Sequence, residues 1–388
     1  MQIVAKTGNE AMAEAMRQIN PDVVAAYPIT PATEVVMIFA QYVADGLVDT
    51  EYIPVESEHS AMSACVGAAA AGGRVMTGTS SQGLALMYEI LPIASALRLP
   101  IIMAEVNRAL SGPINIHCDH SDTMAARDFG WIQIFSENAQ EAYDNMLQAV
   151  RIAENTKVNL PTMVTTDGFI ISHCMENIKI LEDQEVKDFI GEKNAPVSIL
   201  DTDHPVTIGA LDLQDYYFEH KRQVVDAMSK VNPVILEVAE EFAKKTGRKY
   251  GLIEEYKLAD ADFAIVALGS TCGTAKVVID ELRAKGIKAG MLKIRVFRPF
   301  PAEIIAEKLS PIPAMAILDR SDSYNGQGGP VFTEIRSALY DKGKKPKMIN
   351  YIYGLGGRDI MQKDIQSVFN DLKEIDNKLQ INYLGVRE

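Results

Sequence analysis

Acidic side chains crowd the segment PVESEHSA, residues 54–61, which joins a predicted apolar strand to a predicted alanine-rich helix. Glu56 and Glu58 stand at the helix N-terminus, where the helix dipole stabilises a carboxylate, so first-turn capping explains both. A second interpretation applies to Glu58. If it is buried over a crevice, its carboxylic acid could hydrogen-bond a ring nitrogen and exchange a proton with a heterocycle. His59 is predicted to be a packed or surface histidine.

Thr30 lies in the sequence YPITP, residues 27–31, directly after a short apolar run. Ligands of open parallel sheets bind at the carboxyl ends of the strands, so this hydroxyl would face a binding crevice. Thr30 could instead cap the next helix. Pro28 and Pro31 fix the backbone on either side, which favours the binding role.

A long loop, VNRALSGPINIHCDHSD at 106–122, follows a predicted strand, and long structured loops in compact domains are usually functional. Arg108 stands where that strand ends, and its guanidinium suits a substrate carboxylate, although a structural ion pair is the alternative. The loop's other polar residues collect in short loops by chance, so no metal site is predicted; they are His117, Asp119, His120 and Asp122. A further segment is SSQGLALM at 80–87, in which Ser81, Gln82 and Gly83 begin a predicted helix. The backbone amides of this helix start could bind an anion or the polar edge of a ring, or they could simply begin the helix.

The elements that must position these residues alternate between strand and helix over 20–108, with nearly continuous apolar strands. This pattern predicts an α/β fold with a parallel sheet covered on both faces. A second round of strands and helices completes one domain at 1–180. Residues 181–257 are predicted to be a linker with a long helix at 221–247, and 258–388 a doubly wound α/β domain.

The composition restricts the class of protein. The chain of 388 residues is 47% hydrophobic, and its formal charge of -14 disfavours nucleic-acid partners. No apolar run reaches the roughly 18 residues of a membrane span and no secretory signal is evident, so we expect a cytoplasmic protein. The four cysteines form no C-x-x-C pair, so neither a zinc site nor an iron–sulfur cluster is predicted, and electron carriers, if the reaction needs them, would sit on another chain. P-loop, G-x-S-x-G and H-E-x-x-H motifs are absent, which argues against hydrolases and nucleotide triphosphatases.

Several motifs together resemble the alpha subunit of pyruvate:ferredoxin oxidoreductase, in the 2-oxoacid:ferredoxin oxidoreductase family. They are YPITP, VESEHSA, the Thr-Ser-Ser-Gln-Gly-Leu run at 79–84, NRALSGPINIHCDHSD, KIRVFRPFP, AILDRS and YGLGGRD. The resemblance extends from about residue 5 to about residue 375. It implies a pyrimidine-type thiamine-diphosphate-binding domain at 1–180 and a transketolase C-terminal-like domain at 258–388.

The resemblance also implies roles for individual residues and partners. Glu58 would hydrogen-bond the aminopyrimidine of thiamine diphosphate, and Thr30 and Arg108 would bind the 2-oxoacid carboxylate. Ser81, Gln82 and Gly83 are predicted to contribute to the cofactor site. Partner subunits of beta, gamma and delta type would hold the cofactor's diphosphate, Mg²⁺ and [4Fe-4S] clusters. Coenzyme A would be the co-substrate, and ferredoxin or flavodoxin would accept the electrons.

Pyruvate is the predicted substrate. Relatives acting on 2-oxoglutarate commonly carry Gln-Arg-Gly-Gly-Pro where this chain has Asn-Arg-Ala-Leu at 107–110, and an oxalate-specific relative has a basic residue in place of Thr30. Branched-chain 2-oxoacids such as 2-oxoisovalerate stay open, because one methylene in an apolar pocket is worth only about 1–3 kcal/mol. A non-catalytic assembly subunit is a further alternative. A dinucleotide-dependent dehydrogenase would need a glycine fingerprint where 25–28 read Ala-Ala-Tyr-Pro.

Overall fold

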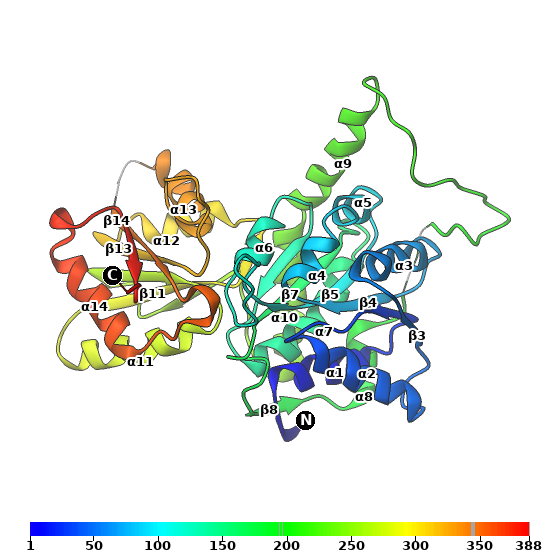
Figure 1. Ribbon diagram of the computed structural model, residues 1–388, viewed down its shortest axis with the longest axis horizontal. Helices are drawn as coiled ribbons and strands as arrows, with labels where there is room; N and C mark the ends of the chain where they lie inside the picture. The colour runs from blue at the N-terminus through cyan, green and yellow to red at the C-terminus, as the bar shows by residue number, and fades with distance from the viewer. Residues whose placement is uncertain (194, 196, 343–345, 388) are drawn as a thin grey trace.

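The computed structural model describes residues 1–193, 195, 197–342 and 346–387. These residues form two α/β lobes, each built around one main sheet (Figure 1). Within these residues the larger sheet has seven strands, all parallel except the antiparallel edge strand β12. In spatial order they are β12 (Val296–Arg298), β6 (Ile132–Phe135), β7 (Thr162–Asp167), β5 (Ile101–Asn107), β4 (Val75–Thr79), β2 (Val23–Ala26) and β3 (Glu51–Pro54).

Helices cover both faces of this sheet, as its apolar strands predict. Alternate residues of β5 separate the two cores: Ile102 and Ala104 join one hydrophobic cluster, and Ile101 and Met103 the other. The first cluster includes residues from α1 (Gly8–Ile19), α2 (Thr33–Ala44), α7 (Ala139–Ala153), α8 (Asp183–Ile190) and α10 (Val231–Thr246). The second includes α3 (Glu58–Ala70), α4 (Ser81–Leu86) and α5 (Leu91–Ala96). The short helix α6 (Ser121–Ala125) follows the long loop.

The second sheet has six strands within the described residues, and two helix pairs enclose it. Its order is β15 (Ile381–Leu384), β14 (Lys347–Tyr353), β13 (Ala314–Asp319), β10 (Phe263–Ala267), β11 (Ala289–Ile294) and β9 (Ile253–Tyr256). The helices are α11 (Thr271–Ala284) and α14 (Gln362–Lys373) on one face, and α12 (Ala302–Leu309) and α13 (Pro330–Tyr340) on the other. A separate ribbon pairs β1 (Gln2–Lys6) with β8 (Glu176–Ile180).

Prolines divide two segments whose sequence pattern predicts one helix each. The segment SQGLALMYEILPIASAL at 81–97, which reads as one helix, forms two short helices, α4 and α5, and Pro92 lies in the first turn of α5. The predicted helix at 221–247 is α9 (Tyr217–Ser229) and α10, with Pro233 in the first turn of α10. Proline lacks the amide hydrogen that a helix interior requires, whereas the first turn tolerates it.

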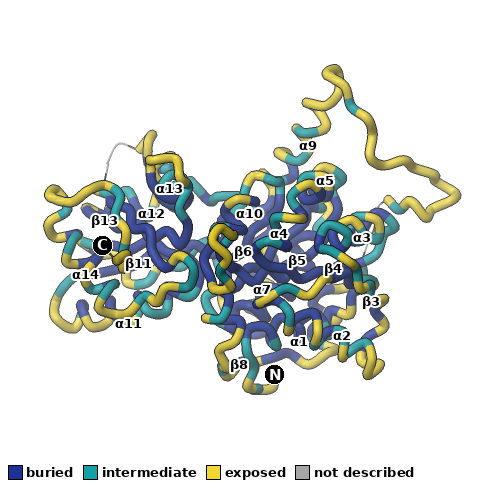
Figure 2. The backbone as a smooth tube through the Cα atoms, in the orientation of Figure 1, coloured by how far each residue is buried: buried dark blue, intermediate teal, exposed yellow. Residues whose placement is uncertain are grey.

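The described residues between α8 and α9, together with α9 itself, form an arm that leaves the body of the molecule and returns to it (Figure 1). Most of its described residues are exposed, as the colouring of Figure 2 shows. Large apolar side chains on it face solvent, among them Leu200, Leu211, Leu213, Tyr216, Tyr217 and Phe218. The predicted domain boundaries stay a prediction, and the arm falls within the segment predicted as a linker.

Buried charges join the two sheets. Lys293 of β11 is 2% exposed, and its Nζ lies 2.6 Å from Glu137, 2.5 Å from Glu141 and 2.9 Å from Glu254. Burial alone would lower the pKa of this lysine, but Glu141 and Glu137 outweigh burial and hold the pKa well above its ordinary value. Glu137 and Glu141 belong to the lobe of the larger sheet, whereas Lys293 and Glu254 belong to the smaller sheet. The ammonium group therefore links the two lobes.

Lys293→Met should therefore destabilise the protein by about 3–5 kcal/mol, because it leaves the buried carboxylate of Glu141 without its cation, whereas Glu137 and Glu254 keep Lys276. Chemical denaturation would measure the loss. Lys244→Met is the matched control, since Lys244 forms an exposed pair with Glu240. Equal stability of the two variants would contradict the bridging role.

Candidate functional site

The candidate site lies at the carboxyl ends of four adjacent strands. Thr30 follows β2, Glu58 follows β3, the segment Ser81–Gly83 follows β4, and Arg108 directly follows β5. Neighbouring parallel strands end at the same edge of a sheet, so residues up to 78 positions apart in sequence meet there. The sheet order thus brings together the side chains that the sequence pattern singles out.

Arg108 contacts the Thr30 backbone. The guanidinium is 7% exposed; its Nη1 donates to the Thr30 carbonyl oxygen at 2.9 Å and its Nε to that of Asn115 at 2.8 Å. Burial lowers the pKa of Arg108, with an opposing effect from Asp122. No carboxylate of the described residues forms an ion pair with this guanidinium, so the alternative of a structural ion pair is not found. Nη2 is left to bind an external anion.

Thr30 does not cap the helix that follows it. The N-cap position of α2 is Ala32, which makes no side-chain cap hydrogen bond. Thr30 is exposed, and no hydrogen bond of its hydroxyl is found among the described residues. The hydroxyl is thus available beside the carbonyl group that binds Arg108.

Glu58 is the first residue of α3, and Ser57, not Glu58, caps this helix. Its side chain is buried, with 6% exposure, and burial raises the pKa of the carboxyl group. No side chain of the described residues donates a hydrogen bond to it. A Cβ atom on Gly83 would lie 2.6 Å from Glu58 Oε1 and would also collide with the Thr79 hydroxyl. Only glycine at 83 therefore leaves room for the carboxyl group, which is free to bond a ring nitrogen.

The neighbours of Glu58 have different surroundings. Glu56 is exposed and accepts a hydrogen bond from Ser60 Oγ at 2.5 Å, which lowers its pKa. His59 is a surface histidine, as predicted, and lies 3.2 Å from Glu89. Of the two acids in this segment, only Glu58 is buried and has a raised pKa.

The turn into α4 is occupied by internal hydrogen bonds. The Ser81 amide donates to Asp122 Oδ2 at 3.1 Å, and the Ser81 hydroxyl lies 2.7 Å from the Ala109 carbonyl oxygen. The Gly83 amide donates to the Ser80 carbonyl group. Those two amides are not available to a ligand, so a cofactor contact from this turn would come from the Gln82 side chain or from close approach at Gly83.

Two acids support this site: Asp122, for which the sequence predicted no such role, and Glu105, which the sequence interpretation missed. Asp122 is fully buried and accepts hydrogen bonds from the amides of Ser81, Arg108 and Thr123 and from the Asn107 side chain. No sequence signal separates such a residue from the other polar residues of the loop. Glu105 is also fully buried, in the apolar strand IIMAEVN. An acid within a buried strand is rare, and that signal could have identified it.

A second buried network connects the long loop to the smaller sheet. Asp167 lies 2.7 Å from His120 Nε2 and accepts from Arg320 Nη1 at 2.8 Å. Burial would raise the pKa of Asp167, but His120 and Arg320 hold it well below its ordinary value. Cys118 lies beside His120 and Asp167 in a grouping that could resemble a metal site. Arg320 already supplies the positive charge there, so the network is a structural ion pair.

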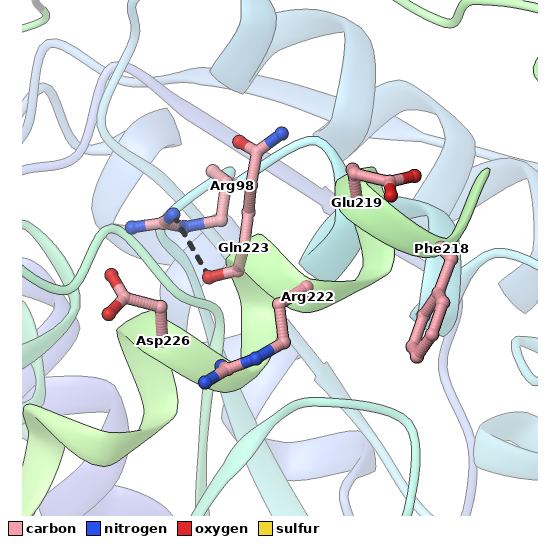
Figure 3. Close-up of a pocket in the computed structure, with 6 residues that line it drawn as sticks. All are labelled: Arg98, Phe218, Glu219, Arg222, Gln223 and Asp226. Carbon is pink, nitrogen blue, oxygen red and sulfur yellow. Dashed lines mark hydrogen bonds between the residues drawn. The ribbon is translucent and has the colours of Figure 1, made fainter. Parts of the chain in front are cut away.

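The cavity of about 620 Å³ beneath α9 shares no residue with the candidate site (Figure 3). It is lined by Arg98, Phe218, Glu219, Arg222, Gln223 and Asp226. Among the described helices none combines the length and the apolar character that crossing a bilayer requires.

Solved structures with low sequence identity share this fold. The 2-oxoglutarate:ferredoxin oxidoreductase of Magnetococcus marinus aligns with a TM-score of 0.75 at 20% identity, over 96% of this chain and 65% of that chain. A split-gene transketolase aligns with a TM-score of 0.55 at 12% identity, over 94% and 97% of the two chains. The predicted α/β fold with a parallel sheet is confirmed.

Sequence comparison extends this likeness to nearly the whole chain. Pyruvate synthase subunit PorA of Thermotoga maritima is 57% identical over 99% of this chain and 98% of its own length. The PorA protein of Methanocaldococcus jannaschii is 48% identical over 98% and 97%. Ketoisovalerate oxidoreductase subunit VorA of Pyrococcus abyssi is 43% identical over 95% and 93%. Residues 14–240 match the thiamine-diphosphate-binding model of pyruvate flavodoxin/ferredoxin oxidoreductases, and 261–365 match core domain II of pyruvate:ferredoxin oxidoreductase. The chain belongs to the pyruvate:ferredoxin oxidoreductase family.

Proposed function

We propose that this chain is the thiamine-diphosphate-binding alpha subunit of a pyruvate:ferredoxin oxidoreductase. The complex would convert pyruvate and coenzyme A to acetyl-CoA and carbon dioxide and pass the electrons to ferredoxin or flavodoxin. One observation carries the proposal: within the described residues a buried carboxyl group that no side chain hydrogen-bonds, Glu58, and a buried guanidinium that forms no ion pair, Arg108, lie at the same sheet edge. The PorA relatives, 57% and 48% identical, support pyruvate as the substrate.

Each residue has a role that its surroundings allow. Bound thiamine diphosphate would supply the electron sink for decarboxylation. The Glu58 carboxyl group, whose pKa burial raises, would hold or release a proton at a pyrimidine nitrogen of the cofactor. Arg108 Nη2 and the Thr30 hydroxyl would bind the 2-oxoacid carboxylate. The fixed positions of the Arg108 Nε and Nη1 hydrogen bonds would orient that carboxylate.

Other chains would complete the enzyme. The described cysteines lie apart and unpaired, three buried and Cys174 exposed, so the clusters that carry single electrons would sit on partner subunits. We infer that beta, gamma and delta-type subunits hold those [4Fe-4S] clusters, Mg²⁺ and the cofactor's diphosphate. The exposed apolar side chains of the arm support such assembly, because apolar patches of this kind mark interaction surfaces. We expect the complex to work in the cytoplasm.

A branched-chain 2-oxoacid is the second candidate substrate, since the VorA protein of Pyrococcus abyssi is 43% identical to this chain. The site residues named above would serve either substrate through the same carboxylate and the same cofactor. A non-catalytic assembly role is disfavoured, because a subunit that only buttresses a partner has no need of a buried unpaired carboxyl group and a buried unpaired guanidinium together.

Glu58→Gln should reduce turnover of the natively purified complex by about 10²–10⁴-fold, because the amide cannot exchange a proton with the ring. The assay is coenzyme-A-dependent reduction of a viologen dye with pyruvate, 2-oxoisovalerate or 2-oxoglutarate. Glu56→Gln is the matched control, since it changes an exposed acid two residues away, and it should keep full activity.

Wild-type activity led by pyruvate supports the proposal. Higher activity with 2-oxoisovalerate than with pyruvate would support the same mechanism but would assign a branched-chain 2-oxoacid as the substrate. An unimpaired Glu58→Gln complex, or a wild-type complex inactive with every 2-oxoacid, would refute the cofactor role of this chain.

Arg108→Lys should raise the KM for the 2-oxoacid at least about 10-fold, because loss of a charge-assisted hydrogen bond costs about 1.5–3 kcal/mol. The KM for coenzyme A should stay unchanged, and steady-state kinetics measures both constants. Equal increases in the two KM values would indicate a general structural defect and count against a carboxylate-binding role.

Substitution of the arm should weaken assembly without altering the fold. Leu211 is 89% exposed and Phe218 76% exposed, so the double variant Leu211→Ser and Phe218→Ser removes apolar surface that a partner would bury. Size-exclusion chromatography of the co-expressed complex should show loss of a subunit. Leu379→Ser, at an equally exposed position in the other half of the chain, is the control. An intact complex in the double variant would contradict this role of the arm.

A further inference from the structure

Glu105 occupies an apolar strand and has no ordinary partner for an ionised carboxylate. Its side chain is fully buried, and neither of its oxygens forms a hydrogen bond of normal geometry within the described residues, although the nearby Ser81 amide opposes the rise of its pKa. The residues beside it in register, Thr79 of β4 and Thr165 of β7, have buried hydroxyl groups that also lack partners. A charged carboxylate in such a place would cost several kcal/mol, so the neutral acid is the stable form.

The carboxyl group that faces Glu105 is that of Asp122. The two side chains are within hydrogen-bonding contact, and the Ser81 amide lies next to both. Asp122 is the better site for the negative charge, because three backbone amides and the Asn107 side chain donate to it. The other ionisable groups that face the pair are Asp119 from the loop, Tyr88 from the turn after α4, and Arg108.

We propose, on the basis of the function proposed above, that Glu105 is a positioning residue that stays protonated and donates its hydroxyl proton to Asp122. The pair then carries one negative charge, which is shared among the donors around Asp122. Burial, Asp122 and the contact between the two side chains raise the pKa of Glu105 well above its ordinary value, in agreement with this geometry.

The shared proton keeps Asp122 in place, and Asp122 fixes the two segments that contain Ser81 and Arg108. Asp122 holds the amide of Ser81, whose φ of 47° lies in the left-handed region that a non-glycine residue adopts only under constraint. Two residues later, Gly83 contacts Glu58. Asp122 also holds the amide of Arg108, whose side chain would bind the substrate carboxylate. Loss of the proton would place two negative charges in contact and loosen both segments together.

Glu105→Gln, Glu105→Leu and wild type test this inference in the intact complex. Glutamine keeps a donor to Asp122 and cannot ionise, whereas leucine removes the donor. We expect Glu105→Gln to keep kcat and KM within about threefold at neutral pH, and to retain activity at alkaline pH where the wild type declines. Glu105→Leu should raise the KM for the 2-oxoacid at least about 10-fold and weaken thiamine diphosphate binding. A lost kcat in Glu105→Gln, or unchanged constants in Glu105→Leu, would overturn the proposal.

Two further measurements do not depend on catalysis. A protonated buried acid gives an infrared carbonyl band that ionised carboxylates lack, and the difference spectrum of wild type minus Glu105→Gln at neutral pH should show one such band. Because the folded-state pKa is raised, the stabilising effect of Glu105 is complete below the unfolded pKa and is lost as pH rises toward the folded value. Glu105→Gln should therefore gain stability relative to wild type with increasing pH. Absence of the band and a flat stability difference would refute the protonated pair, whereas inactivity of the wild-type complex with every 2-oxoacid would refute only the proposed function.

Discussion

The carboxylate of Asp122 accepts hydrogen bonds from groups in three segments: the turn after β4, the end of β5, and the start of its own helix α6. Parallel strands deliver chain ends to one edge of a sheet but do not fix the loops that follow them. Here one buried anion fixes those loops, because every amide that it accepts would otherwise be a buried donor without a partner. The positions of Ser81 and Arg108 both depend on it.

The smaller sheet takes part in the same arrangement. Asn115, whose carbonyl group binds Arg108, donates its side-chain amide to the Gly356 carbonyl group at 3.0 Å, and the Gly356 amide donates to Asp119 at 3.0 Å. Gly356 and Gly357 have positive φ, and a Cβ atom on Gly357 would collide with His117. The glycine-rich turn YGLGGRD therefore packs directly against the long loop of the candidate site. The ion pair between Arg320 and Asp167 links the two lobes nearby. The C-terminal half thus shapes the loop of the candidate substrate site.

Sequence patterns predict the parts of this structure that repeat. Continuous apolar strands and their alternation with helices are sufficient for the covered parallel sheet, and that sheet places Thr30, Glu58 and Arg108 at one edge. Breaks within helices were missed at Pro92 and Pro233, where a proline begins a new helix instead of following an old one. Asp122 could not be predicted, because its role depends on donors from three segments whose approach only the folded chain defines. The roles given to Ser81, Gln82 and Gly83 stay predictions, since two of their amides serve internal hydrogen bonds.

Three glutamates in this region show why the residue type alone does not define the chemistry. Glu56 is exposed and bonded to Ser60, so it stays an ordinary carboxylate. Glu58, two positions later, is buried beside a glycine and keeps an open bonding position, which suits exchange of a proton. Glu105 is fully enclosed against a second acid, which suits permanent retention of a proton. A buried acid with an open bonding position can titrate during a reaction, whereas an acid fully enclosed beside an anion is a fixed hydrogen-bond donor. A site that needs one acid to exchange a proton and another to retain its proton can thus use glutamate for both, with the two residues buried to different extents at the same sheet edge.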